Sequence, residues 1–64
     1  MRKDIILNHY NRIKNEEYTT LIVVGSDLYE RYYPTYDHPD YTPLEKDLTE
    51  EELCLCASLG ISKR

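Results

Sequence analysis

Few residue types in this chain could bind a metal ion. They are His9, His38, Cys54 and Cys56. On a helix, side chains two positions apart point about 200° away from each other, so Cys54 and Cys56 cannot hold one ion together. A zinc site made of His38, one cysteine and Asp37 or Asp40 would lack any recognised ligand spacing. We therefore expect no metal and no cofactor, with Cys56 in the core as a small apolar side chain and Cys54 half exposed.

Acid–base chemistry has one candidate, the segment DHPD at residues 37–40, in which His38 stands between two carboxylates. Catalysis also needs a nucleophile, a pocket and a means of excluding water, and the sequence shows no pattern for any of these. The segment GSD at residues 25–27 lacks the glycine-rich context that binds phosphate, so it is predicted to be a turn. We expect a solvated loop histidine, no catalytic residue and no enzymatic activity.

The segment YERYYPTYDHPDYTP, residues 29–43, concentrates a different chemistry. It holds five of the seven tyrosines, three acidic residues and all three prolines. Tyrosine gives wide, rigid contact area at low entropic cost, and carboxylates attract Arg and Lys on a partner. A chain without Phe or Trp also needs tyrosine as its large apolar side chain, and Tyr10 and Tyr18 fit the edge of a core in this way. The excess favours a protein-binding surface.

The charge is uneven along the chain. Residues 27–53 carry nine acidic and two basic side chains, while the flanking segments are slightly basic and the whole chain has a net charge of −4. Such a block repels phosphate, which argues against direct nucleic-acid binding, and attracts basic proteins over long range. The alternative is that the acids only keep a small domain from associating.

Sixty-four residues predict one small domain, residues 1–64, with a thin aliphatic core. A chain of this size buries only about 60% of its unfolded surface, which leaves no room for an enzyme-sized cavity. Ile6, Tyr10 and Ile13 have helical spacing, with Asp4 in the first turn, so residues 2–17 predict an N-terminal helix.

A β-hairpin is predicted next, because YTTLIVV and DLYERYYP are rich in β-branched and aromatic residues and flank Gly25-Ser26, a type II′ turn. The expected register is Val23 opposite Leu28, Ile22 opposite Tyr29 and Thr20 opposite Arg31. A short helix from Asp27 is the rival, since Asp27 and Glu30 fit a capping box. Pro34 should end the second strand, and residues 34–43 should be an extended or turning loop.

A C-terminal helix is predicted in DLTEEELCLCASLGI. Thr49 and Glu52 form a capping box, and Leu48 and Leu53 a hydrophobic staple. Gly60 stands where a left-handed residue ends a helix. The fold class is therefore α+β: N-terminal helix, β-hairpin, Pro/Tyr-rich loop and C-terminal helix.

These features predict a non-enzymatic, acidic inhibitor that occupies the basic surface of a host nucleic-acid-binding protein or nuclease by charge mimicry of phosphate. In size and charge, though by no motif, the chain resembles the small acidic inhibitors that viruses often carry. The expected contact residues are Glu30, Tyr32, Tyr36, Asp37, Asp40, Tyr41, Asp47, Glu50 and Glu51.

The alternative is a homo-oligomerising assembly module. It would form a dimer through the hairpin edge and the helix face around Leu53, Cys56 and Leu59. The chain shows no signal peptide and no apolar run long enough to span a membrane, so we expect a reducing, cytoplasmic setting and no membrane partner.

Overall fold

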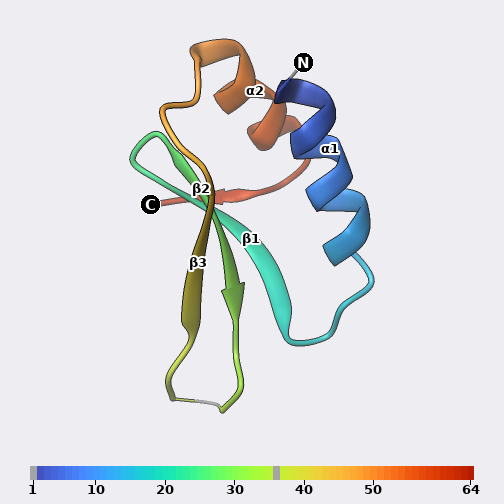
Figure 1. The fold of residues 1–64 in the computed structure, drawn as a ribbon, viewed down its shortest axis with the longest axis vertical. Coiled ribbons are helices and arrows are strands. Elements are labelled where there is room, and N and C mark those ends of the chain that lie inside the picture. Colours follow the sequence, from blue (N-terminus) through green and yellow to red (C-terminus); the bar gives the residue numbers. More distant parts are fainter. Residues whose placement is uncertain (1, 36) are drawn as a thin grey trace.

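The fold is a small α+β domain with both helices on one face of a four-stranded sheet (Figure 1). The computed structural model describes residues 2–35 and 37–64. The elements are α1 (Arg2–Ile13), β1 (Thr19–Val24), β2 (Asp27–Tyr32), β3 (Asp40–Glu45), α2 (Glu50–Ser58) and β4 (Ser62–Lys63). The strand order is β3-β2-β1-β4, which confirms the predicted fold class and adds two strands to it.

The β1–β2 hairpin has the predicted register. Val23 pairs with Leu28, Ile22 with Tyr29 and Thr20 with Arg31. Gly25 has φ +65° and Ser26 does not have a positive φ, as a type II′ turn requires. The rival helix from Asp27 does not form, because residues 27–32 are a strand.

The segment predicted to be a loop, residues 34–43, ends in strand β3, which begins at Asp40 and continues to Glu45, and this is a correction to the sequence analysis. Residues 40–45 pair antiparallel with β2, and the register shifts between Leu28 and Tyr29 so that Leu44 is an extra residue. Leu44 packs against the core from this bulge. Pro43 argued against a strand, but β3 lies at the edge of the sheet, where a residue without an N–H donor is tolerated.

Both ends of α2 form as the sequence predicts. The Thr49 side chain accepts from the Glu52 N–H, and the Glu52 side chain accepts from the Thr49 N–H. At the C-terminal end, Gly60 has φ +78° and its N–H donates to Ala57. The Ile61 N–H donates to Cys56, which completes a Schellman motif and directs the chain into β4.

The core lies between the helices and the sheet. Its buried residues come from both helices, from β1 and β2 and from the segment before α2: Ile6, Ile13, Leu21, Val23, Leu28, Leu48 and Cys56. Cys56 is therefore a core residue as expected, whereas Cys54 is exposed. Ile22 points to the other face of the sheet and is only 1% exposed. The sheet thus buries apolar side chains on both faces.

We expect Ile6→Ala to lower the free energy of unfolding by about 2–5 kcal/mol, because Ile6 is fully buried and its removal leaves a cavity. Urea denaturation followed by circular dichroism measures this. The matched control is Ile5→Ala on the same helix, where the side chain is 43% exposed and the loss should be below about 1 kcal/mol. Equal losses in the two variants would contradict the burial of α1 described above.

Candidate functional site

A bidentate ion pair joins the two helices at one end of the molecule. Arg2 Nε lies 2.9 Å from Glu52 Oε2, and an Arg2 terminal nitrogen lies 2.7 Å from Glu52 Oε1. The same guanidinium donates to the backbone carbonyls of Lys46 and Asp47, each at 2.8 Å. One arginine therefore fixes α1, α2 and the segment between β3 and α2 against one another.

Glu52 is the acceptor at the centre of this arrangement. Its side chain also accepts from the Thr49 N–H at 2.8 Å, so one carboxylate caps α2 and binds Arg2. Hydrogen bonding from Arg2, followed by that from Thr49, lowers the pKa of Glu52 from 4.5 to about 2. The capping box was predicted from sequence, but Arg2 as its partner was not.

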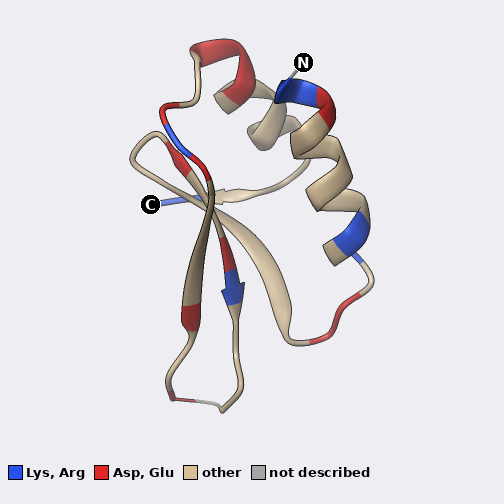
Figure 2. Cartoon of the chain, in the orientation of Figure 1, with Lys and Arg blue, Asp and Glu red and all other residues tan. Residues whose placement is uncertain are grey.

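Carboxylates gather around the ion pair of Arg2 and Glu52, which we call the clamp. We call the surface that they form the acidic end. Its acidic residues are Asp4, Asp27, Glu45, Asp47, Glu50, Glu51 and Glu52, and its basic residues are Arg2, Lys3 and Lys46. Figure 2 shows most of them on the first turns of both helices and on the chain between β3 and α2. Among these residues the carboxylates outnumber the cations by four, and the backbone of Arg64 lies beside the hairpin turn next to this surface.

Local contacts hold the acidic end in shape. Asp27 accepts from the Asp47 N–H at 3.0 Å, and the Leu48 N–H donates to Ser26 at 2.8 Å, which ties the hairpin turn to the chain before α2. Asp47 has φ +54°, a conformation that aspartate tolerates better than most residues. Lys3 binds Glu51 at 3.1 Å at the solvent-exposed rim.

The predicted contact residues divide between separate parts of the molecule. Asp47, Glu50 and Glu51 lie at the acidic end. Asp37 and Asp40 lie in and after the β2–β3 loop at the opposite end of the long axis. The structure therefore does not bring the acidic candidates onto one face.

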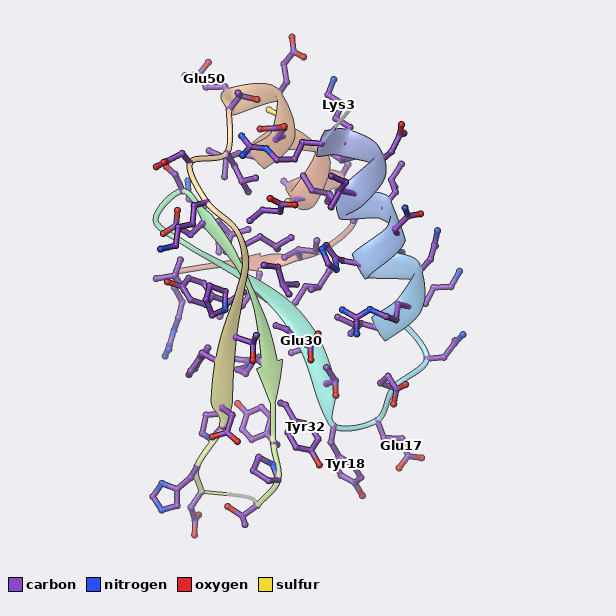
Figure 3. All side chains as sticks on the ribbon, in the orientation of Figure 1. Lys3, Glu17, Tyr18, Glu30, Tyr32 and Glu50 are labelled. Carbon is purple, nitrogen blue, oxygen red and sulfur yellow. The ribbon has the colours of Figure 1, made fainter. Side chains whose placement is uncertain are left out.

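The remaining candidates have other surroundings. Glu30 lies on the helix side of the sheet and binds Arg12 at 2.9 Å. Tyr41 lies on the face without helices, where its ring meets Tyr29 edge-on, with centroids 6.4 Å apart. Tyr32 lies near the end of β2, beside Tyr18 (Figure 3). Tyr36 falls outside the described residues.

The face without helices carries alternate residues of each long strand. The β2 residues there are Tyr29, Arg31 and, just past the strand, Tyr33. The Arg31 guanidinium lies 5.4 Å from the centroid of the Tyr33 ring. Tyr29 stands opposite the buried Ile22 in the hairpin register, which gives this tyrosine a structural role.

An aromatic groove opens at the end opposite the acidic end. It is lined by Glu17, Tyr18, Tyr32, Tyr33, Pro34 and Thr35, with a volume of about 740 Å³. Figure 3 shows Glu17, Tyr18 and Tyr32 together at this end of the molecule. Tyr18 was predicted to lie at the edge of the core, yet it is 59% exposed. The predicted hairpin register could have indicated that these tyrosines meet, because extending it by one pair beyond Thr19 and Tyr32 places Tyr18 opposite Tyr33.

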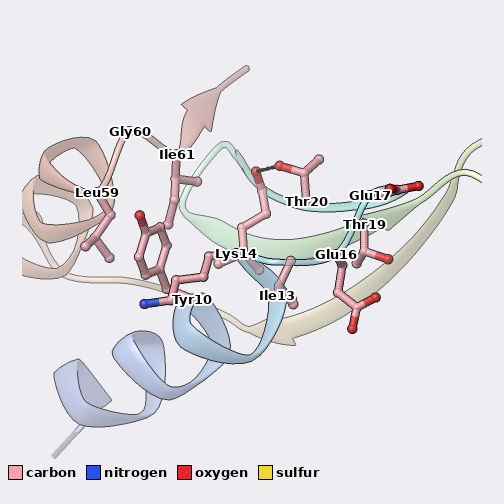
Figure 4. Close-up of a pocket in the computed structure, with 11 residues that line it drawn as sticks. Tyr10, Ile13, Lys14, Glu16, Glu17, Thr19, Thr20, Leu59, Gly60 and Ile61 are labelled. Atoms are coloured by element: carbon pink, nitrogen blue, oxygen red, sulfur yellow. Dashed lines mark hydrogen bonds between the residues drawn. The ribbon is translucent and has the colours of Figure 1, made fainter.

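A smaller crevice of about 300 Å³ lies between α1, the start of β1 and the end of α2 (Figure 4). Tyr10, Lys14 and Glu16 line it together with Leu59 and Ile61. The described lining residues include no cysteine, serine or histidine, and the two carboxylates among them, Glu16 and Glu17, do not make up an ion site of three ligands. We assign no chemistry to this crevice.

The residues considered for metal or acid–base chemistry are not brought together. His9 lies on α1 within 3.3 Å of Arg12, His38 lies in the β2–β3 loop, and both cysteines lie on α2. Within residues 2–35 and 37–64, no three His, Cys, Asp or Glu side chains are placed to hold an ion.

Comparison with known proteins found no matching family model, no matching curated protein and no matching solved structure. Neither α1 nor α2 is long and apolar enough to cross a membrane.

We expect the acid stability of the fold to depend on Glu52. Its pKa is lower in the folded chain than when unfolded, so its contribution is complete above pH 4.5 and is lost as the pH falls toward about 2. Glu52→Gln should therefore have a lower melting temperature than the unmodified chain at pH 7, and the difference should shrink toward pH 2. Thermal melts monitored by circular dichroism from pH 7 to pH 2 measure this.

The matched control for this prediction is Glu51→Gln, which removes an exposed carboxylate of the same helix turn. Its melting temperature should follow that of the unmodified chain across the range. A constant gap between Glu52→Gln and the unmodified chain at every pH would mean that ionisation of Glu52 does not stabilise the fold.

Proposed function

We propose that this protein is a non-enzymatic inhibitor that docks its acidic end on the basic, nucleic-acid-binding surface of a partner protein. The observation that carries the proposal is the placement of the net negative charge at one end, around the start of α2. A nuclease or another nucleic-acid-binding protein has the complementary surface, because it neutralises phosphates with Lys and Arg.

The arrangement of the acidic end supports binding rather than only solubility. Arg2 holds the backbone of Lys46 and Asp47, so the carboxylates between β3 and α2 are presented by a fixed segment. Preorganised charges lose little conformational entropy when a partner binds. Asp47 and Glu50 are exposed and make no ion pair among the described residues, which leaves both available to cations on a partner.

Charge mimicry implies particular binding kinetics. Long-range attraction accelerates the encounter of oppositely charged surfaces, and salt weakens it because the Debye length shortens from about 30 Å at 0.01 M to about 8 Å at 0.15 M. The proposal places the protein in a reducing, cytoplasmic compartment of a host cell, as a virus-encoded inhibitor would be.

Self-association remains the alternative, and one observation favours it. Strand β3 lies at the edge of the sheet and is exposed from Asp40 to Pro43. The helix face named for this role is already occupied, because Leu53, Cys56 and Leu59 pack on the protomer's own core. Pro43 also removes one donor from the edge, which limits strand pairing there.

The double variant Asp47→Asn/Glu50→Gln should weaken partner binding by on the order of tenfold at low salt, because two exposed carboxylates leave the acidic end. The tagged chain is used to recover partners from host lysate at low salt, and the recovered partner is titrated against each variant. Asparagine suits residue 47 because it also tolerates a positive φ.

The matched control is Glu16→Gln/Asp37→Asn, which removes two exposed carboxylates outside the acidic end. It should bind within about twofold of the unmodified chain. Equal weakening by both double variants would mean that total charge governs binding and not the acidic end. An affinity that is the same at low and physiological salt would rule out charge mimicry, and recovery of only the chain itself would favour self-association.

A further inference from the structure

The aromatic groove is built on strand ends and is therefore a fixed feature. Tyr18 and Tyr33 are joined by a backbone hydrogen bond of 2.9 Å from the Tyr33 N–H to the Tyr18 carbonyl. Tyr32 pairs across the hairpin with Thr19, the residue after Tyr18. The backbone positions of the three tyrosines are therefore fixed by the β1–β2 ladder.

The exposure of these rings calls for an explanation. Tyr18 is 59% exposed and Tyr32 is 45% exposed, although the domain has few large apolar side chains with which to build its core. Together with Tyr33 and Pro34 they line one groove at one end of the molecule, where Figure 3 shows Tyr18 and Tyr32 close to each other. Contiguous apolar surface of this kind marks interaction sites, whereas single exposed residues do not.

The charge around the groove selects the sign of its ligand. The described residues that line it include one carboxylate, Glu17, and no basic side chain. Asp40 stands opposite Tyr32 on β3 and brings a second carboxylate to this end. Arg12 binds Glu30 and Arg31 lies over the Tyr33 ring, while Lys14 lines the neighbouring crevice that Glu17 also borders. A cationic ligand fits these surroundings, and phosphate does not.

The shape and chemistry of the walls select the ligand further. Proline-rich segments in the polyproline II conformation dock in aromatic-lined grooves, and they lose little entropy because they are extended before they bind. Tyrosine hydroxyls at the rim can donate to the unpaired backbone carbonyls of such a segment. A volume of about 740 Å³ is large enough for several residues.

We propose that the groove formed by Glu17, Tyr18, Tyr32, Tyr33 and Pro34 binds a proline-containing, basic peptide segment of a partner protein. Proline rings pack on Tyr18 and Tyr32, and an arginine of the segment pairs with Glu17 or crosses a tyrosine ring. This site is separate from the acidic end, so the protein has two binding surfaces at opposite ends of its long axis.

The test uses the ¹⁵N-labelled chain, titrated with the capped peptide Ala-Pro-Pro-Arg-Pro-Pro-Arg-Pro-Ala and followed by NMR. The arginines are three residues apart and lie on one edge of a polyproline II helix. Shift changes should be confined to residues 17–20 and 31–35. Tyr18→Ala should weaken binding at least about fivefold, and Tyr18→Phe, which keeps the ring, should restore most of the affinity. Glu17→Gln should weaken binding about two- to fivefold and flatten its salt dependence.

Controls separate this site from the rest of the molecule. Tyr41→Ala removes an exposed tyrosine outside the groove and should leave the affinity unchanged, as should Asp47→Asn/Glu50→Gln at the acidic end. Peptides with glutamate in place of arginine, or alanine in place of proline, should bind at least about fivefold more weakly.

Three outcomes would overturn the proposal. One is the absence of shift changes at millimolar peptide. Another is equal weakening by Tyr18→Ala and Tyr41→Ala. The third is movement of the groove resonances on dilution without peptide, which would make a second copy of this chain the occupant.

Discussion

The contact between Arg2 and Glu52 is the interaction on which the arrangement of the helices depends. The two residues are 50 positions apart in sequence and belong to the two helices, which also share one apolar core. Glu52 is 8% exposed, and a carboxylate this far from water must be fully hydrogen-bonded to be tolerated. Arg2 and Thr49 supply those bonds, so the same carboxylate caps α2 and holds α1 against it.

This clamp also determines where charge can collect. The guanidinium of Arg2 pairs with the carboxylate of Glu52 and donates hydrogen bonds to the carbonyls of Lys46 and Asp47, so it does not neutralise the other carboxylates of the acidic end. The exposed carboxylates at the start of α2 interact favourably with the positive end of the helix dipole. A negative surface therefore forms beside a stabilising ion pair without an equivalent number of cations to cancel it.

At the opposite end of the molecule, the exposure of the tyrosines is set by how far the helices extend over the sheet. There the hairpin strands run beyond the helices, so their residues have no second layer to pack on (Figure 1). Tyr18 and Tyr32 remain exposed for that reason, while Ile22, nearer the centre of the sheet, is buried. The separation of acidic and aromatic surfaces is thus a consequence of helices that cover only part of the sheet.

Local patterns made much of the fold predictable. The capping box at Thr49, the left-handed Gly60 and the hairpin register all follow from residues within a few positions of one another. Strand β3 was missed because a proline such as Pro43 cannot donate a ladder hydrogen bond. The proline is tolerated because β3 lies at the edge of the sheet, and the sequence does not reveal that position. The grouping of charges was also missed, since it depends on the docking of α1 against α2 through Arg2 and Glu52, and sequence order placed the acids of residues 37–40 in the same block.

The two cysteines acquire different chemistry from their helix positions. Cys56 is 1% exposed, and burial raises the pKa of its thiol, so it is protected from electrophiles. Cys54 is exposed on the same helix, four residues after Glu50. A thiol-reactive dye would therefore attach to one site on the folded chain, close to the acidic end and remote from the groove, without any engineered residue. The native sequence thus carries its own attachment point for a fluorescent reporter that can tell the two ends of the molecule apart.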